Sequence, residues 1–447
     1  MPTKRSGKRQ RIQAAGPADL ERQVRQLLAD KVSGNLLGLW LLIPEHLRLG
    51  TWDLLRTWSG DLDNGALAPR LALHLVHEAA LCRPTLRPDR SLRHKGFELA
   101  NGLPFLPADT VFHELLNAHT VAQALQLQVA LGKLRLASGH FSGRLLALDP
   151  HRLVSYSKRD MVQRRPSANE PATKQAQTFF LLDADTGQPI CLTNASSAPT
   201  ATEAAQDVIQ LAMQILPPKE EKERLLILAD VEHFAVELID FVRQSTPYDI
   251  LVPVRQTPAL QLHYTSLPQA AFVPHWAGFA IATEPFLPRR STLDQPCTRY
   301  IQRAGESPQA YHFKGFCCSR PRSEVLTLTS DFPKRWHIEE FFRFDQNLGW
   351  NRAGTMNLHI RSGQMTFALI AQTVIYQLRK RLGDPFAKWD AAHLAKDLFT
   401  GLEGDVRVCQ DTVLVTYYNA PMANQWKEHF ENLPQRLEDQ GVDPRVP

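Results

Sequence analysis

Two apolar runs that each close on an aspartate constrain the fold of this chain more than any other feature. They are Arg144–Asp149 and Leu225–Asp230. Strands with so few polar residues are typical of a sheet that is covered on both faces. We predict that each aspartate ends its strand and lies at the rim of the sheet. Two acids at neighbouring strand ends repel each other unless a cation lies between them, so the pattern favours a cation site.

The segments around these two runs predict the order of the sheet. Strand-like runs and helical patterns alternate in the order β-β-β-α-β-α-β, and the further segments are Thr178–Leu182, Ile190–Thr193, Thr202–Ile215 (helix), Phe234–Val242 (helix) and Ile250–Val254. The first links are hairpins, whereas strands that alternate with helices are expected to pair in parallel. Pro253 predicts a strand end or an edge strand. This order is ribonuclease-H-like, and the predicted class is α/β with a mixed central sheet.

Composition shifts divide the 447 residues into six predicted parts. The core is interrupted by a β-rich insertion with strand candidates at Ala270–Val273, Gly278–Thr283 and Val325–Thr329. Two helices, Thr110–His119 and Val121–Leu136, are compatible with a helix-turn-helix reader of DNA or with an ordinary helical hairpin. The parts are a basic tail (1–16), a helical N-terminal DNA-binding domain (17–140), the first part of the core (141–256), the insertion (257–330), the second part of the core (331–385) and a C-terminal region (386–447).

A glutamate far downstream is the third candidate acid. A helix is expected to start near Pro333, and on it Arg335, Glu339 and Gln346 fall along one stripe, whereas Glu340 lies about 100° away. An ordinary Arg335–Glu339 helix pair is the alternative. Three carboxylates can hold two divalent ions about 3.5–4 Å apart, a geometry that promotes attack on a phosphodiester. Oxygen ligands suit Mg2+ or Mn2+.

Rival acids and basic residues complete the predicted site. Asp183 and Asp185 are alternatives to Asp149, but they flank a turn, where aspartate is common for local reasons. The segment after the first strand carries Arg152, Lys158, Arg159, Arg164 and Arg165, and a phosphate backbone is expected to pass there. A solvated loop is the other interpretation. The net charge of +5 is compatible with DNA binding, and the first eleven residues hold five Lys and Arg side chains.

Other chemistries lack their motifs. The chain has no phosphate-binding P-loop and no nucleophile elbow, and its six cysteines lack zinc-site spacing. The N-terminus has no apolar segment typical of a signal peptide. A reduced, cytoplasmic protein is therefore expected.

These motifs resemble the DDE transposases of bacterial insertion sequences, in the subgroup with a β-rich insertion before the glutamate. Phe332, Arg335, Glu339 and Gln346 match the spacing of that subgroup's Y-x2-R-x3-E-x6-K signature, with phenylalanine for tyrosine and glutamine for lysine. The two aspartate strands match as well, and the resemblance covers roughly residues 140–380.

The resemblance implies that Asp149, Asp230 and Glu339 bind two Mg2+ or Mn2+ ions. It further implies that one site cleaves double-stranded DNA at the element's inverted repeats and joins the end to a target. A homodimer or larger assembly on DNA and an association with the nucleoid follow from it. Arg335 and Gln346 are the implied DNA contacts on the helix. A nuclease that only hydrolyses, and a non-catalytic DNA-binding descendant of a transposase, stay open as alternatives.

Overall fold

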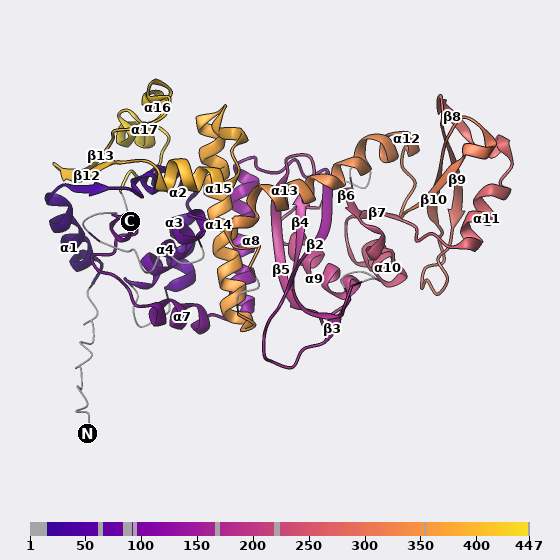
Figure 1. Ribbon diagram of the computed structural model, residues 1–447, viewed down its shortest axis with the longest axis horizontal. Coiled ribbons are helices and arrows are strands. Elements are labelled where there is room, and N and C mark those ends of the chain that lie inside the picture. The colour runs from indigo at the N-terminus through magenta and orange to yellow at the C-terminus, as the bar shows by residue number, and fades with distance from the viewer. Residues whose placement is uncertain are drawn as a thin grey trace. The chain divides into compact units, whose positions relative to one another are not determined.

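The chain packs into two compact units, Met1–Ala118 with Ile370–Pro447 (unit 1) and His119–Leu369 (unit 2). The computed structural model describes residues 16–60, 66–83, 92, 96–165, 170–218, 224–352 and 355–445 (Figure 1). The predicted basic tail lies outside these residues except for Gly16. The division differs from the predicted boundaries, because the C-terminal region packs with the N-terminal helices.

A mixed sheet forms the centre of unit 2 (Figure 1). Its middle strands lie in the order β5-β4-β2-β6-β7, where β5 pairs antiparallel with β4, β4 antiparallel with β2, β2 parallel with β6, and β6 parallel with β7. The predicted order of strands and helices is confirmed. The bounds are β2 Leu145–Val154, β3 Gln163–Arg164, β4 Thr173–Asp183, β5 Gln188–Ser196, β6 Leu226–Ala229 and β7 Asp249–Pro253.

One face of this sheet packs on α9 (Ala201–Met213) and α10 (Val236–Ser245). The apolar core of that face contains Leu146 and Leu148 of β2 and Ile227 and Ala229 of β6, together with buried residues of both helices. Side chains alternate between the faces of a strand. Asp149 follows Leu148 and Asp230 follows Ala229. Both aspartates therefore point to the opposite face of the sheet.

The prediction that Asp149 ends its strand is wrong. Strand β2 continues to Val154, because its antiparallel partner β4 is long and pairs with it as far as Val154↔Gln175. The parallel partner β6 ends at Ala229, which pairs with Leu148. Beyond that point β2 has a strand on one side only, where a proline such as Pro150 is tolerated. Asp149 thus lies at the end of the parallel ladder but inside its strand.

The insertion extends the same sheet instead of forming a separate one. Strand β11 pairs antiparallel with β7, with Cys318 opposite Leu251, and the order continues β11-β10-β9-β8. Pro253 is the last residue of β7, as predicted for a strand end, but β7 has partners on both sides. The other elements are α11 Pro258–Ser266, β8 Val273–Trp276, β9 Phe279–Phe286, β10 Cys297–Ala304 and β11 His312–Cys318.

The strand predicted over Val325–Thr329 is wrong as well. Its alternating Val, Leu and Thr residues are instead helical, in α12 (Glu324–Leu326) and a π-helical turn (Thr327–Asp331). The hydroxyl of Thr329 donates to the carbonyl oxygen of Val325 at 2.6 Å, a bond by which threonine is accommodated in a helix. A 3-10 turn, η8 (Phe332–Trp336), leads directly into α13 (His337–Asp345).

Two long helices lie at the two points where the chain passes from one unit to the other. Helix α8 (Val121–Ala137) belongs to unit 2, and Thr120 and Gln123 form its capping box. The preceding α7 (Asp109–Ala118) belongs to unit 1. The two predicted helices therefore exist, while their role as a DNA reader stays a prediction. Helix α14 (Leu358–Leu382) begins in unit 2 and ends in unit 1.

Unit 1 is mostly helical and contains a small antiparallel sheet in the order β1-β12-β13. Strands β12 and β13 of this sheet lie in the C-terminal region of the chain. Among the described residues of either unit, no helix is long and apolar enough to cross a membrane. The elements are α1 Pro17–Ala29, β1 Val32–Gly34, α2 Ile43–Leu49, α3 Thr51–Ser59, α4 Ala68–Ala80, α6 Phe97–Ala100, α15 Ala391–Leu394, β12 Gly404–Cys409, β13 Thr412–Tyr417, α16 Ala423–Phe430 and α17 Leu433–Asp439.

Buried histidines make unit 1 sensitive to acid. The rings of His46 and His77 are buried with centroids 5.2 Å apart, and burial lowers the pKa of both, that of His77 to about 4. A histidine held neutral in the fold gains a proton more readily when unfolded. The free energy of unfolding is therefore expected to be highest above pH 6.5 and to fall as the pH drops towards 4. His77 alone accounts for up to about 3 kcal/mol of this fall.

The test is the free energy of unfolding of unit 1 as a function of pH. The variant His77→Gln is expected to flatten the curve between pH 6.5 and 4, whatever it costs at neutral pH. A matched control is His393→Gln on the exposed side of α15, which should leave the slope as it is. An unchanged slope in His77→Gln would contradict this account.

Candidate active site

Asp149 and Asp230 lie side by side on the open end of the parallel ladder. Each directly follows the last β2–β6 pair, Leu148↔Ala229, and both face away from the core shared with α9 and α10. The carboxylate of Asp230 accepts from the amide of Val231 at 2.5 Å and begins the 3-10 turn η4 (Val231–His233). The two aspartates that the sequence singled out are therefore neighbours in the fold.

Helix α13 and turn η8 cover the same face. Turn η8 contacts β2 and β6, and α13 contacts β2. The ring centroid of Phe342 lies 5.3 Å from that of Phe180 and 4.9 Å from that of His151. Phe180 is the residue of β4 that pairs with Asp149. Aromatic packing thus fixes the helix that carries Glu339 over the strand that carries Asp149.

Arg335 interacts with Glu339 and with Asp149. Its Nη2 donates to Oε1 of Glu339 at 2.9 Å, so the predicted helix pair is present. Its positive charge also acts on Asp149 and lowers the pKa of that carboxyl. Arg335 therefore pairs with Glu339 and lies near enough to Asp149 for its charge to act on that carboxyl.

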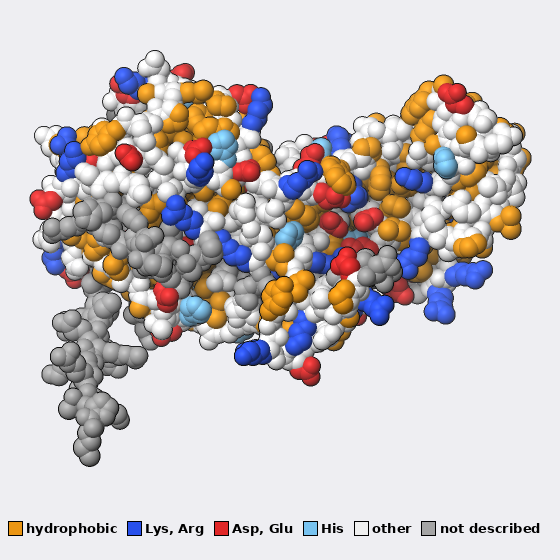
Figure 2. Space-filling model, viewed as in Figure 1, with side chains coloured by type: hydrophobic (Ala, Val, Ile, Leu, Met, Phe, Trp, Pro, Cys, Tyr) orange, Lys and Arg blue, Asp and Glu red, His pale blue; other side chains and the backbone are white. Residues whose placement is uncertain are grey.

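The environment of Asp149 disfavours a negative charge. Burial is the largest cause, followed by the charge of Glu232 and, more weakly, that of Asp230; together they raise the pKa of Asp149 to about 7 despite Arg335 and Arg152. A carboxyl with a strongly raised pKa beside other acids is typical of a functional site. Figure 2 shows Asp and Glu side chains gathered over this part of unit 2, with Lys and Arg around them.

Glu232, which was not among the predicted residues, also belongs to the site, because its charge acts on Asp149. Its Oε2 accepts from Nη2 of Arg152 at 2.7 Å, while Nε of Arg152 donates to Gln177 at 2.9 Å. Arg152, predicted to lie in the basic loop, is in fact part of β2. The available signal was the position of Glu232 two residues after Asp230, at a strand end where the chain must turn.

His233 is the other missed residue. Its ring is fully buried, and neither nitrogen has a hydrogen-bond partner among the described residues. Burial lowers its pKa to about 4, and the charges of Glu232, Arg152, Asp230 and Arg335 act on it more weakly. It therefore lies close to the same group of charged residues.

The donor chemistry of the acids suits a hard cation, but their arrangement does not fit a two-metal centre. In the described part of the chain, no three His, Cys, Asp or Glu side chains are placed to hold one metal ion together. The ion pair with Arg335 engages Glu339 instead.

The rival acids have structural roles. Asp183 is fully buried and accepts from the amides of Gly143, Asp185 and Thr186, which fixes the turn between β4 and β5. Asp185 binds Arg144 and Lys334. The carboxylates of both residues already have hydrogen-bond or ion-pair partners. They lie near the first residues of β2, where Asp183 pairs with Leu146, and away from the Asp149–Asp230 pair.

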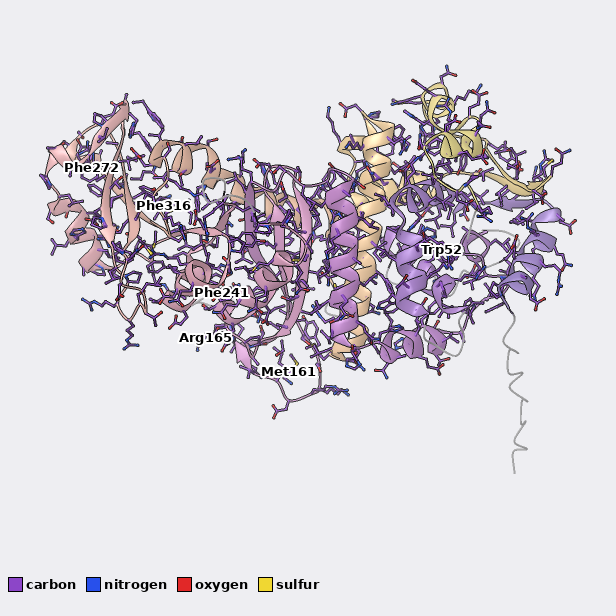
Figure 3. All side chains as sticks on the ribbon, turned by 180° about the vertical axis from the view of Figure 1, so that it is seen from behind. Trp52, Met161, Arg165, Phe241, Phe272 and Phe316 are labelled. Carbon is purple, nitrogen blue, oxygen red and sulfur yellow. The ribbon has the colours of Figure 1, made fainter. Side chains whose placement is uncertain are left out.

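The predicted DNA-binding residues of the loop differ in their surroundings. Lys158, Arg159 and Arg165 are exposed, whereas Nη2 of Arg164 donates to the carbonyl oxygen of Ala198 at 2.8 Å. Met161 and Arg165 lie where this loop projects beyond the strands (Figure 3). Gln346 follows the end of α13 in a 3-10 turn and is half-buried.

The comparisons with known proteins found structural likenesses but no match in sequence. No family model and no curated protein matches the sequence. Among solved structures, the chain is similar to the piggyBac transposase in a cryo-EM synaptic complex with hairpin DNA, with 11% identity and a TM-score of 0.40, over 74% of this chain and 69% of that chain. The function proposed below rests on the geometry of the chain itself.

Proposed function

We propose that this protein is a DNA transposase of the DDE type, which cleaves DNA at the inverted repeats of an insertion sequence and joins the ends to a target. The observation that carries the proposal is the pair Asp149 and Asp230 at the end of adjacent parallel strands. The strand order β5-β4-β2-β6-β7 supports it, because this is the ribonuclease-H-like order. A carboxylate-bearing helix, α13, covers the same face.

The proposed roles follow from the positions of the residues. Asp149, Asp230 and Glu339 are the acids of the catalytic centre, which calls for Mg2+ or Mn2+ as in other carboxylate sites that act on phosphodiesters. Arg335 and Gln346 lie on or beside the helix that carries Glu339, and would contact DNA there. A homodimer on paired DNA ends is part of the proposal.

A second function is favoured by one observation. Because Arg335 binds Glu339 and no three acids are placed to hold a metal in the described residues, a DNA-binding protein without catalysis is the competing candidate. It predicts DNA affinity without strand cleavage.

The deciding experiment uses an oligonucleotide duplex with a 3′-hydroxyl end taken from the DNA that flanks the gene, a supercoiled target plasmid, and Mg2+ or Mn2+. Joined product is the result expected of a transposase. Cleavage without joining would identify a nuclease, and binding without either would support the non-catalytic candidate.

The exposed cations of the loop are proposed to contact phosphates. Each phosphate contact adds about 0.9 to the slope of log affinity against log salt concentration. The triple variant Lys158→Gln, Arg159→Gln, Arg165→Gln is therefore expected to reduce that slope by up to about 3. Arg164 is excluded, because its guanidinium already binds backbone carbonyl oxygens.

Fluorescence anisotropy of a labelled duplex over a range of salt concentrations measures this slope. Lys427→Gln, at an exposed position of α16 in unit 1, serves as the control that removes charge elsewhere. An equal slope for wild type and the triple variant would show that the loop does not touch DNA.

A further inference from the structure

The turn between β4 and β5 holds the helical segment that leads into the candidate site. Asp185 of this turn binds Nζ of Lys334 at 2.5 Å, and the carbonyl oxygen of its neighbour Ala184 accepts from Nδ1 of His337 at 2.6 Å. Building on the proposed function, we propose that Asp185 is a positioning residue, which fixes how the segment that carries Glu339 is rotated about its own axis.

Three side chains of this segment, the anchors, recur at every third residue. They are Asp331, Lys334 and His337, and Asp331 accepts from Nη1 of Arg144 at 2.8 Å. Turn η8, which lies between the first and the last anchor, is a 3-10 helix. A 3-10 helix has three residues per turn, so side chains three apart lie on one side of it. In an α-helix each anchor would be rotated by about 60° from the one before, so the 3-10 conformation is what aligns them.

Arg335 and Glu339 lie on another side of the same segment. They are joined by an ion pair of 2.9 Å, and Arg335 follows the anchor Lys334 directly in the chain. Successive residues are offset by about 100–120° around a helix axis. The contacts of the anchors therefore decide which way the ion pair points, and in the fold the charge of Arg335 acts on Asp149.

Asp185 is connected to two of the three anchors. Besides Lys334, it accepts from Arg144 at 2.9 and 3.1 Å, and Arg144 in turn binds the anchor Asp331. Burial acts to raise the pKa of Asp185, but the hydrogen bonds from Arg144 and Lys334 outweigh it and lower this pKa. The turn lies near the first residues of β2, away from Asp149, so Asp185 acts on the site through the helical segment.

The first test is hydrogen–deuterium exchange of the full-length protein without DNA, read by mass spectrometry. In Asp185→Asn, the amides of residues 334–345 are expected to exchange about tenfold faster than in wild type, because charge-assisted hydrogen bonds that hold the segment are weakened. Exchange in β2 and β6 should stay as it is, whereas a general loss of stability would raise it there too. Asp294→Asn, the same substitution at an exposed position of the insertion, is the matched control.

Lys334 tests the same contact from the helical side. Lys334→Gln removes the charge that Asp185 binds and should speed exchange in the same residues, whereas Lys334→Arg keeps the charge and should restore much of the protection. The double variant Asp185→Asn, Lys334→Gln should exchange little faster than Asp185→Asn, because both changes remove one shared interaction. Unchanged exchange of residues 334–345 in Asp185→Asn, an equal rise throughout unit 2, or fully additive effects would overturn the proposal.

DNA cleavage measures what the rotation of the segment does for the reaction. Asp185→Asn is expected to lower the rate of cleavage about a hundredfold, the size of effect that a displacement of about 1 Å can have, with DNA affinity close to wild type. If wild type cleaves DNA and Asp185→Asn cleaves it equally fast, only the positioning role is wrong. If exchange changes as expected but wild type cleaves no DNA, Asp185 still fixes the segment and the transposase activity is wrong.

Discussion

Asp149→Asn is expected to reduce DNA strand cleavage by about a thousandfold or more, while making the fold more stable. Loss of one essential group of a catalytic centre commonly has an effect of this size. Asparagine has nearly the shape of aspartate, so the packing of β2 against α13 is preserved. The measurement is the rate of cleavage of flanking-DNA duplexes by wild type and variant at equal protein concentration.

The gain in stability follows from the pKa of Asp149. In the fold this pKa is raised from 3.8 to about 7, chiefly by burial. A raised carboxyl pKa means that the fold retains the proton longer than the unfolded chain, so stability is lost as the pH rises from 3.8 to 7. The variant should therefore gain on the order of 2 kcal/mol above pH 7 and little at pH 4.

Glu340→Gln is the matched control, because Glu340 lies next to Glu339 but is exposed. It should leave both cleavage and the pH dependence of unfolding close to wild type. An Asp149→Asn variant that cleaves DNA at the wild-type rate would remove the enzymatic interpretation.

Asp249→Ala is expected to destabilise unit 2 by about 3 kcal/mol, because it leaves three partly buried arginines without their counter-charge. Asp249 begins β7 and has a side chain only 5% exposed. Arg224, Arg320 and Arg322 converge on it at 3.2, 3.6 and 2.8 Å. Chemical denaturation of wild type and variant measures the change.

Two further variants distinguish the loss of the Asp249 charge from the general effect of shortening a side chain on the free energy of unfolding. Asp249→Asn keeps an oxygen acceptor and should lose less stability than Asp249→Ala. Glu306→Ala, at an exposed position of the insertion, should change the free energy of unfolding by less than about 0.5 kcal/mol. Equal losses for Asp249→Ala and Glu306→Ala would show that the arginines do not depend on Asp249.

The order of the central strands could be predicted because each apolar run is buried on both faces and carries a clear pattern. The turn between β4 and β5 was equally visible, since Asp183 and Gly187 have local reasons to be there. Asp149 was placed in the right strand but at the wrong point of it. The parallel pairing of β2 with β6 ends where the shorter strand, β6, ends. The sequence of β2 contains no information about the length of β6.

Long-range contacts explain what the sequence could not show. The pair Arg152–Glu232 joins residues on different elements, so their pairing could not be predicted from either stretch of sequence. The segment Val325–Thr329 has the alternation of a strand, yet tertiary packing makes it helical, with Leu328 buried. The division into units also escaped prediction, because the contacts that unite residues 16–118 with 370–445 are remote in the chain.

The unbroken sheet has a mechanical consequence. Backbone hydrogen bonds run from the outermost strand β8 through β11 and β7 to β6, the strand that delivers Asp230. Force applied to the strands of the insertion would therefore reach β6 through the pairing of β11 with β7 and of β7 with β6.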